Sequence, residues 1–249
     1  MSYADGAVYS GEWHHGKRKG VGMSKFDARC AHQSRCGAGV YEGEFAHDHE
    51  EGKGKFTYAD GNTVEGFWKD GAPDLMGSKT PFDITYVNGD RYHGSGDWGQ
   101  GLIRGRFTPT HMVCACGKGS MSYHLSTHYD GEWQAGVHQG FGTLKLGNGD
   151  VYTGQWLDGM QDGDGELVTV RGERLQGLWT KGDLVSGDEP ATIKYSNGDV
   201  YTGALRDRCR HGPGSLEYAN GRVYSGEWKC GRKMDGYGTM TFPSLFLVS

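Results

Sequence analysis

Residues 148–156 read Asn-Gly-Asp-Val-Tyr-Thr-Gly-Gln-Trp, and the pattern aromatic-x-Gly-x-aromatic within them returns about every 23 residues along the 249-residue chain. Six of the seven tryptophans stand at the second aromatic position of this pattern. Its copies, each with glycine two residues after the start, begin at Tyr9, Tyr41, Val64, Tyr92, Tyr129, Tyr152, Leu175, Tyr201 and Tyr224. A repeat of this length indicates an array of small structural units, and it explains many motifs that would otherwise suggest catalysis.

Each copy of the pattern predicts one β-hairpin. Residues two apart lie on the same face of a strand, so Tyr9, Gly11 and Trp13 share one face, while Ser10 and Glu12 share the other. A glycine seven residues after most starts suits a hairpin loop with positive φ. A second pattern, Gly-x-Gly-x-x-x-aromatic, follows as the return strand. Asp-Gly or Asn-Gly pairs then join successive hairpins, which favours two-residue turns.

The hairpins predict an all-β fold, an elongated single-layer antiparallel sheet of about nine repeats. About 18 strands at about 4.8 Å each would extend for about 85 Å. The chain has 45 glycines and only 35% hydrophobic residues, which is too little apolar volume for an ordinary globular core. Rings stacked between repeats would replace that core. We therefore expect residues 1–249 to form one array.

Composition narrows the classes of function. The polar start of the chain predicts no signal peptide, and no apolar run is long enough for a membrane span. The net charge of −5 argues against nucleic-acid binding. Six irregularly spaced cysteines favour a reducing, cytoplasmic location over a disulfide scaffold.

The sequences at 9–13 (Tyr-Ser-Gly-Glu-Trp), 41–45 (Tyr-Glu-Gly-Glu-Phe) and 148–156 resemble the MORN repeat, and the resemblance covers nearly the whole chain. It implies a single-layer array of hairpins. MORN arrays occur in junctophilins, alsin, plant phosphatidylinositol phosphate kinases, protist cytoskeletal proteins and radial-spoke-head proteins. The repeat-only pattern here resembles the cytoskeletal and axonemal members. By analogy it implies a non-catalytic scaffold in a large cytoplasmic assembly, in the cytoskeleton and the axoneme of cilia or flagella.

The array is interrupted where we expect partner-specific contacts. Insertions at 27–40 and 102–116 lengthen two connections, and a short apolar tail follows at 243–249. Smaller irregularities occur at 73–81 and 187–190. Long loops on a regular scaffold often bind other proteins. The terminal strands of an open sheet also invite strand addition, from a partner or from a second copy of the chain.

The aromatic face of the sheet is a second predicted protein-binding surface, a trough that would hold a helix or an extended peptide. Its predicted lining is Tyr9, Trp13, Tyr41, Phe45, Trp68, Tyr92, Trp98, Tyr129, Trp133, Tyr152, Trp156, Trp179, Tyr201, Tyr224 and Trp228.

Basic residues at the hairpin loops support an alternative, a membrane-associated tether that binds anionic phospholipid or an acidic protein surface. A solvated edge accounts for them equally well. They are Lys17, Arg18, Lys19, Arg206, Arg208, Arg210, Lys229, Arg232 and Lys233.

No catalytic, cofactor or metal site is predicted. Two groups of potential zinc ligands lack the spacing of a zinc finger. They are Cys30, His32 and Cys36 in one insertion and His111, Cys114 and Cys116 in the other. No serine, cysteine or threonine stands in a strand-to-helix turn that would expose a nucleophile. An open sheet also offers little of the enclosed space that catalysis uses.

Overall fold

The computed structural model describes residues 1–3, 6–27, 37–74, 81–98, 102–103, 106–107, 113–187, 189–206 and 209–243. The chain divides into two compact units, Met1–Val137 and His138–Ser249. Apart from one short 3₁₀ turn, His124–Ser126, every element in the described ranges is a β-strand. The all-β prediction is therefore confirmed, whereas a single array over 1–249 stays a prediction. None of the described segments is a helix with the length and apolar character to span a bilayer.

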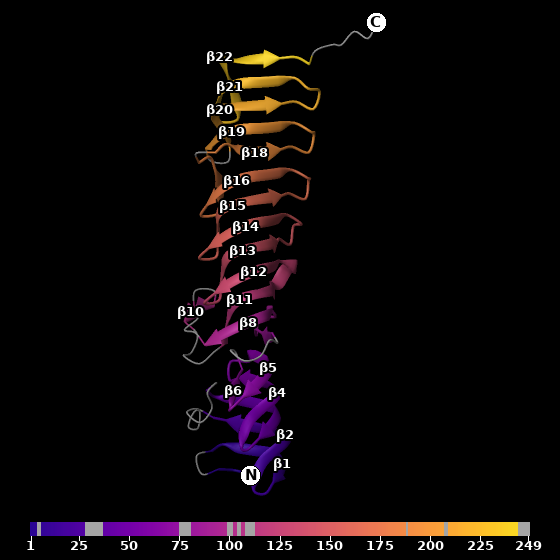
Figure 1. Cartoon of the computed structure of the whole chain (residues 1–249), viewed down its shortest axis with the longest axis vertical. Helices are drawn as coiled ribbons and strands as arrows, with labels where there is room; N and C mark the ends of the chain where they lie inside the picture. The colour runs from indigo at the N-terminus through magenta and orange to yellow at the C-terminus, as the bar shows by residue number, and fades with distance from the viewer. Residues whose placement is uncertain are drawn as a thin grey trace. The chain divides into compact units, whose positions relative to one another are not determined.

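In the first unit, strands that follow one another in the chain pair antiparallel, and Figure 1 shows this succession. Its strands are β1 (Val8–His14), β2 (Lys17–Phe26), β3 (Gly39–Ala46), β4 (His49–Tyr58), β5 (Thr63–Lys69), β6 (Ala72–Pro73), β7 (Phe82–Thr85), β8 (Arg91–Trp98), β9 (Leu102–Ile103), β10 (Arg106–Phe107), β11 (Val113–Ser122) and β12 (His128–Gln134). The pairing continues from β8 to β11 and from β11 to β12.

The second unit repeats this hairpin order. Its strands are β13 (Val137–Lys145), β14 (Val151–Leu157), β15 (Met160–Val168), β16 (Arg174–Thr180), β17 (Asp183–Val185), β18 (Ala191–Lys194), β19 (Val200–Arg206), β20 (Cys209–Glu217), β21 (Val223–Lys229) and β22 (Arg232–Thr241). All nine predicted starts lie in first strands of hairpins.

The return strand is broken in the third and seventh repeats, where the sequence is irregular. It consists of β6 and β7 in one, and of β17 and β18 in the other. The predicted insertion at 102–116 ends earlier than expected. Residues 113–116 belong to β11, and Val113 pairs with Trp98 to lengthen the hairpin. Residues 28–36 of the other insertion and residues 244–249 of the tail lie outside the described residues.

The two kinds of turn differ in length. Within a hairpin, two residues with positive φ form the loop, as in Asp158 (φ 49°) and Gly159 (φ 81°), which is the type I′ geometry. Between hairpins the predicted two-residue turn is wrong. The Leu146 N–H donates to Asp150 O (2.8 Å) and the Gly149 N–H to Leu146 O (2.9 Å), which leaves a three-residue loop. Of its three residues only Gly149 has positive φ (94°), as in a type I turn followed by a bulge.

Candidate functional site

The aromatic side chains that the sequence places on one face form the core of each unit. Thirteen of the fifteen predicted trough residues are buried, with exposed fractions of 0 to 7%. They are Tyr9, Tyr41, Phe45, Trp68, Tyr92, Tyr129, Trp133, Tyr152, Trp156, Trp179, Tyr201, Tyr224 and Trp228. Trp13 is 41% exposed, and the side chain of Trp98 lies outside the described residues. This differs from an open trough, because the rings fill the face themselves.

A register shift in five of the hairpins, those that begin with β1, β3, β14, β19 and β21, explains how these rings become buried. In the hairpin of β14 and β15 the shift falls between Gly154 and Trp156, where Gln155 lies opposite residues 162–164, so the extra residues belong to the return strand. Such a bulge bends the strand and increases its twist. The Tyr152 hydroxyl donates to the Gln155 carbonyl (3.1 Å), and the ring therefore lies over the backbone. Burial raises the pKa of Tyr152 to about 12, so the hydroxyl stays a donor at neutral pH.

The glycine of the pattern is required by this ring. A Cβ on Gly154 would lie 2.7 Å from the Tyr152 hydroxyl oxygen and 2.5 Å from the Cα of Gly165 on the paired strand. The second aromatic is held across the same glycines, since the Trp179 indole N–H donates to Gly165 O (3.0 Å). Four other tryptophans make the equivalent bond.

The residue between the glycine and the second aromatic also has a structural role that the sequence analysis missed. Its side chain accepts a bond from a backbone N–H of the return strand. Glu12 receives it from Val21 (3.2 Å), Glu44 from Lys53 (3.3 Å) and Gln155 from Asp164 (3.0 Å). The recurrence of Glu or Gln at this position could have indicated this role from the sequence.

Three of the nine basic residues predicted to meet lipid lie over aromatic rings instead. Each is the second residue of a return strand, and Arg18 and Arg210 pair in register with Trp13 and Leu205. The Arg210 guanidinium carbon lies 4.3 Å from the Trp228 ring centre, and Lys233 Nζ lies 4.3 Å from that of Tyr224. Lys17, Lys19, Arg206, Lys229 and Arg232 are exposed, and Arg208 lies outside the described residues.

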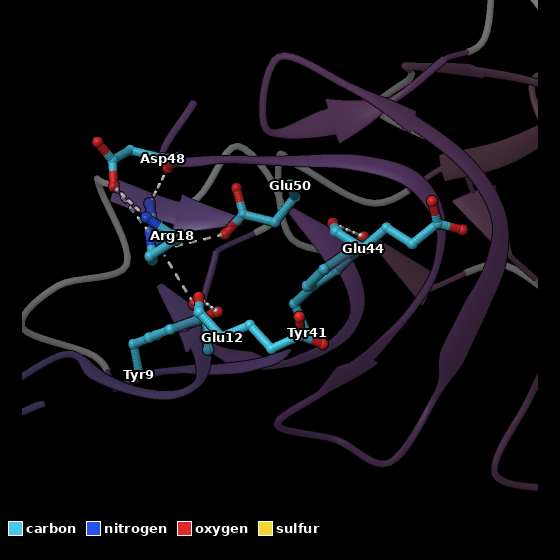
Figure 2. Close-up of polar contacts among 8 residues, drawn as sticks. Tyr9, Glu12, Arg18, Tyr41, Glu44, Asp48 and Glu50 are labelled. Atoms are coloured by element: carbon cyan, nitrogen blue, oxygen red, sulfur yellow. Dashed lines mark hydrogen bonds and ion pairs between the residues drawn. The ribbon is translucent and has the colours of Figure 1, made fainter. Parts of the chain in front are cut away.

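Arg18 is the centre of a polar cluster in the first unit (Figure 2). Its guanidinium lies 5.6 Å from the Tyr9 ring centre and 5.2 Å from that of Phe45. It donates to the Asp48 carbonyl and to Ser24 Oγ (3.1 Å). The Arg18 backbone N–H also donates to the Asp48 carboxylate (2.8 Å). These contacts hold the guanidinium in one orientation.

Glu50 is the buried carboxylate of this cluster. The residue is 8% exposed, and its Oε1 lies 3.8 Å from Arg18 Nη1. That distance is an ion pair without a hydrogen bond, and Oε1 accepts no hydrogen bond from the described residues. Burial raises the pKa of Glu50, and a hydrogen bond to its own backbone and the guanidinium of Arg18 oppose that rise. Its Oε1 is therefore a costly atom to bury without a donor.

A cavity of about 640 Å³ opens beside this cluster. Its apolar wall includes Tyr3 and Trp13, and its polar wall includes Arg18, Asp48, Glu50 and Asp70. The volume lies within the range of about 300 to 1,000 Å³ that is typical of ligand pockets. The cavity therefore joins an exposed indole to a buried carboxylate.

The described residues contain no cluster of three or more His, Cys, Asp or Glu side chains that would hold a metal ion. Cys30, His32, Cys36 and His111 lie outside them. Cys114 is buried, whereas Cys209 and Cys230 are exposed, and these thiols form no disulfide.

Comparison with known proteins identifies the repeat. The model of the MORN repeat matches residues 9–27, 41–63, 129–151, 152–174, 210–221 and 224–244. Five of these segments cover both strands of a hairpin, and 210–221 covers the return strand β20 and the turn after it. No curated protein sequence matches the chain.

Among solved structures, the TCP10 domain of Danio rerio CPAP in complex with a peptide of Danio rerio STIL is similar, with a TM-score of 0.50 at 12% identity over 95% of this chain and 88% of that chain. The same domain alone gives 0.49 at 12% identity over 98% and 99%. The SAS-4 TCP domain of Drosophila melanogaster with a proline-rich motif of Ana2 gives 0.42 at 18% identity over 72% and 85%. The first of these shows a likeness of fold alone.

Proposed function

Because this chain carries MORN repeats, we propose that it is a non-catalytic scaffold that binds other proteins in a large cytoplasmic assembly of the cytoskeleton. The axoneme of cilia and flagella is the assembly to test first. The observation that carries the proposal is that the repeated aromatic residues of one hairpin pack on those of the next. Tyr152 packs on Trp179 with 5.1 Å between ring centres, and Tyr201 on Trp228 with 5.5 Å. Successive hairpins are thereby fixed to one another, which suits a platform for partners.

Two kinds of surface remain for partners once the aromatic face is filled. One is the outward face, where side chains such as Glu42 and Glu65 are polar and exposed. The outer strand β1 pairs with β2 on one side. On the other side, among the described residues, its recorded pairing is a bridge from Val8 to Ser2 and bonds between Tyr9 and Met1. We expect strand addition to β1 beyond Tyr9 as one way in which an extended segment binds.

The fold likeness supports the same expectation. The TCP10 domain of Danio rerio CPAP was solved with a peptide of STIL bound. An antiparallel sheet of this class therefore binds a peptide in at least one protein, and we expect the present chain to bind protein segments as well.

The alternative, a lipid tether, depends on the basic residues. Arg18, Arg210 and Lys233 lie over rings and are occupied within the chain. Lys17 and Lys19 are exposed and lie close together in β2, so they are the residues with which to test lipid binding.

The test begins with a tagged chain expressed in a ciliated cell, followed by cross-linking in the cell and mass spectrometry. We expect enrichment at the cytoskeleton, with the axoneme examined first, and cross-links to a small set of its proteins. A diffuse signal without recurrent cross-links would contradict the scaffold proposal. Liposome flotation with phosphoinositide is the second arm. If the chain floats with the liposomes and the double variant Lys17→Glu, Lys19→Glu does not, the result would favour the tether instead.

A further inference from the structure

Trp13 is the exception among the tryptophans whose side chains are described. It is 41% exposed, whereas Trp68 and Trp228 are each 3% exposed. In other repeats the second aromatic packs on the tyrosine of the preceding hairpin, as Trp228 packs on Tyr201. Trp13 has an edge-on contact with its own Tyr9, with 5.1 Å between ring centres. The remaining part of its ring forms a wall of the cavity.

In two interior repeats this position receives a cation, whereas in another the ring of His138 lies edge-on to Trp156 at 4.9 Å. Arg210, from the hairpin before Trp228, lies over the indole at 4.3 Å. Arg18, from the hairpin before Phe45, lies over that ring at 5.2 Å. A cation from the neighbouring strand thus covers the second aromatic at both places. An indole is the strongest of the aromatic rings in attracting a cation.

The charges of the cavity select the same kind of ligand. Asp48, Glu50 and Asp70 supply three carboxylates. Arg18 is held by Asp48 and Ser24, and the amino group of Met1 donates to Tyr9 O (2.6 Å). Both cations therefore have oxygen partners within the chain, although Arg18 Nε and Glu50 Oε1 are each buried without a hydrogen bond among the described residues. The three carboxylates attract a cationic ligand and repel an anionic one.

We propose that this cavity binds a lysine or arginine side chain of a partner protein, with its cationic group over Trp13 and hydrogen-bonded to Glu50. The partner segment is extended and adds to β1 beyond Tyr9, so that it takes the place that a return strand has in the interior repeats. The inference rests on the proposed protein-binding function and specifies the chemistry of one contact.

The test uses the full chain and peptides of the form acetyl-Thr-Val-Xaa-Val-Thr-amide carrying a fluorophore, with Arg, Lys, Gln or Glu at Xaa. Fluorescence anisotropy gives the affinity of each peptide. We expect the Arg and Lys peptides to bind at least about tenfold more tightly than the Gln peptide, and the Glu peptide to bind most weakly. Equal affinity for Arg and Gln would overturn the inference.

Variants locate the binding. Glu50→Gln keeps the side-chain size, and Trp13→Ala removes a ring that is already exposed. Each substitution should lower the affinity for the Arg peptide about tenfold. Glu42→Gln, an exposed carboxylate in β3, is the matched control and should change affinity less than twofold. Circular dichroism melts confirm that each variant is folded. Unchanged affinity in both folded cavity variants would contradict the site.

Sedimentation at the concentrations used separates a partner segment from a second copy of the chain. One outcome would overturn the proposal. If the chain self-associates, the Arg peptide does not displace this association and Trp13→Ala abolishes it, then a second copy of the chain occupies the cavity. The cross-linking experiment stays independent. If Glu50→Gln retains every cytoskeletal cross-link, the proposed contact of a partner's cation with Glu50 is wrong, while the scaffold function stands. If the chain has no such cross-links but binds the Arg peptide, the scaffold proposal fails and the cavity stands.

Discussion

The indole of Trp179 lies edge-on to the ring of Tyr152, one hairpin earlier, with an interplanar angle of 80° and 5.1 Å between ring centres. The same relation joins Tyr41 to Trp68 in the first unit, at 4.8 Å. Edge-to-face pairs of this kind add to the free energy gained by burying the rings. Neighbouring hairpins therefore share one core.

Removal of Trp179 should destabilise the second unit more than removal of an exposed aromatic. Trp179→Ala deletes a ring that is 3% exposed and a bond to Gly165, so we expect a loss of about 3 to 5 kcal/mol in the free energy of unfolding. Phe141→Ala, at a position that is 57% exposed, is the control and should cost less than about 1 kcal/mol. Urea denaturation of both variants measures the difference, and equal losses would refute the shared core.

The repeated glycine should be more sensitive to a methyl group than a loop glycine. Gly154→Ala places a Cβ within 2.5 Å of the Gly165 Cα, and it should cost about 2 kcal/mol or more. Gly159→Ala meets no atom within 4 Å, and it should cost about 1 kcal/mol through its positive φ alone. Thermal melts rank the two variants, and the reverse order would contradict the close approach of the tyrosine ring.

Acid should weaken the second unit through His138. Burial lowers the pKa of His138 to about 4, and its ring lies edge-on to Trp156 at 4.9 Å. The unfolded chain keeps an ordinary histidine pKa of about 6.5 and binds the proton more readily. Stability is then complete above about pH 6.5 and falls by about 3 kcal/mol as the pH drops to about 4. His138→Gln should remove this part of the dependence, which denaturation at pH 7 and pH 4.5 measures.

Arg210 should contribute to stability although it carries a charge at a loop. Arg210→Ala removes a guanidinium 4.3 Å from the Trp228 ring and a bond to Gly231 O, so we expect a loss of about 1 to 2 kcal/mol. Lys229→Ala, at an exposed position of the next hairpin, should cost less than about 0.5 kcal/mol. Tryptophan fluorescence during unfolding measures the stability of both variants. If Arg210→Ala leaves the free energy of unfolding unchanged, the contact with Trp228 contributes little.

The polar residue of the bulge should act as a backbone partner. Gln155→Ala leaves the Asp164 N–H without its acceptor, and the expected cost is about 1 kcal/mol. Thr153→Ala, two residues earlier on the same strand face, is the comparison. Hydrogen exchange of the Asp164 amide is the direct measurement, and unchanged protection in Gln155→Ala would contradict the role.

The positions of the strands could be predicted because the glycine and the two aromatics recur in register. The turn between hairpins could not, since its length depends on the bonds of Leu146 and Asp150 that the Asn-Gly pair does not specify. The sequence predicted rings stacked between repeats, but it did not predict that they would fill the aromatic face and leave no open trough, because this depends on the register shift after Gly154. The positions of Arg18 and Arg210 over aromatic rings could have been predicted from the sequence, because the second residue of a return strand lies on the aromatic face. The cavity beside Glu50 has no sequence signal, since it joins residues of several strands.

The packing of a tyrosine on the second aromatic residue of the next hairpin has a consequence for synthesis. Tyr152 and Trp179 are 27 residues apart, so a nascent chain completes this contact soon after the second residue leaves the ribosome. Short sequence separation of contacts favours rapid folding. Within each unit, a hairpin can therefore fold onto the one translated before it, and no strand has to wait for a distant partner.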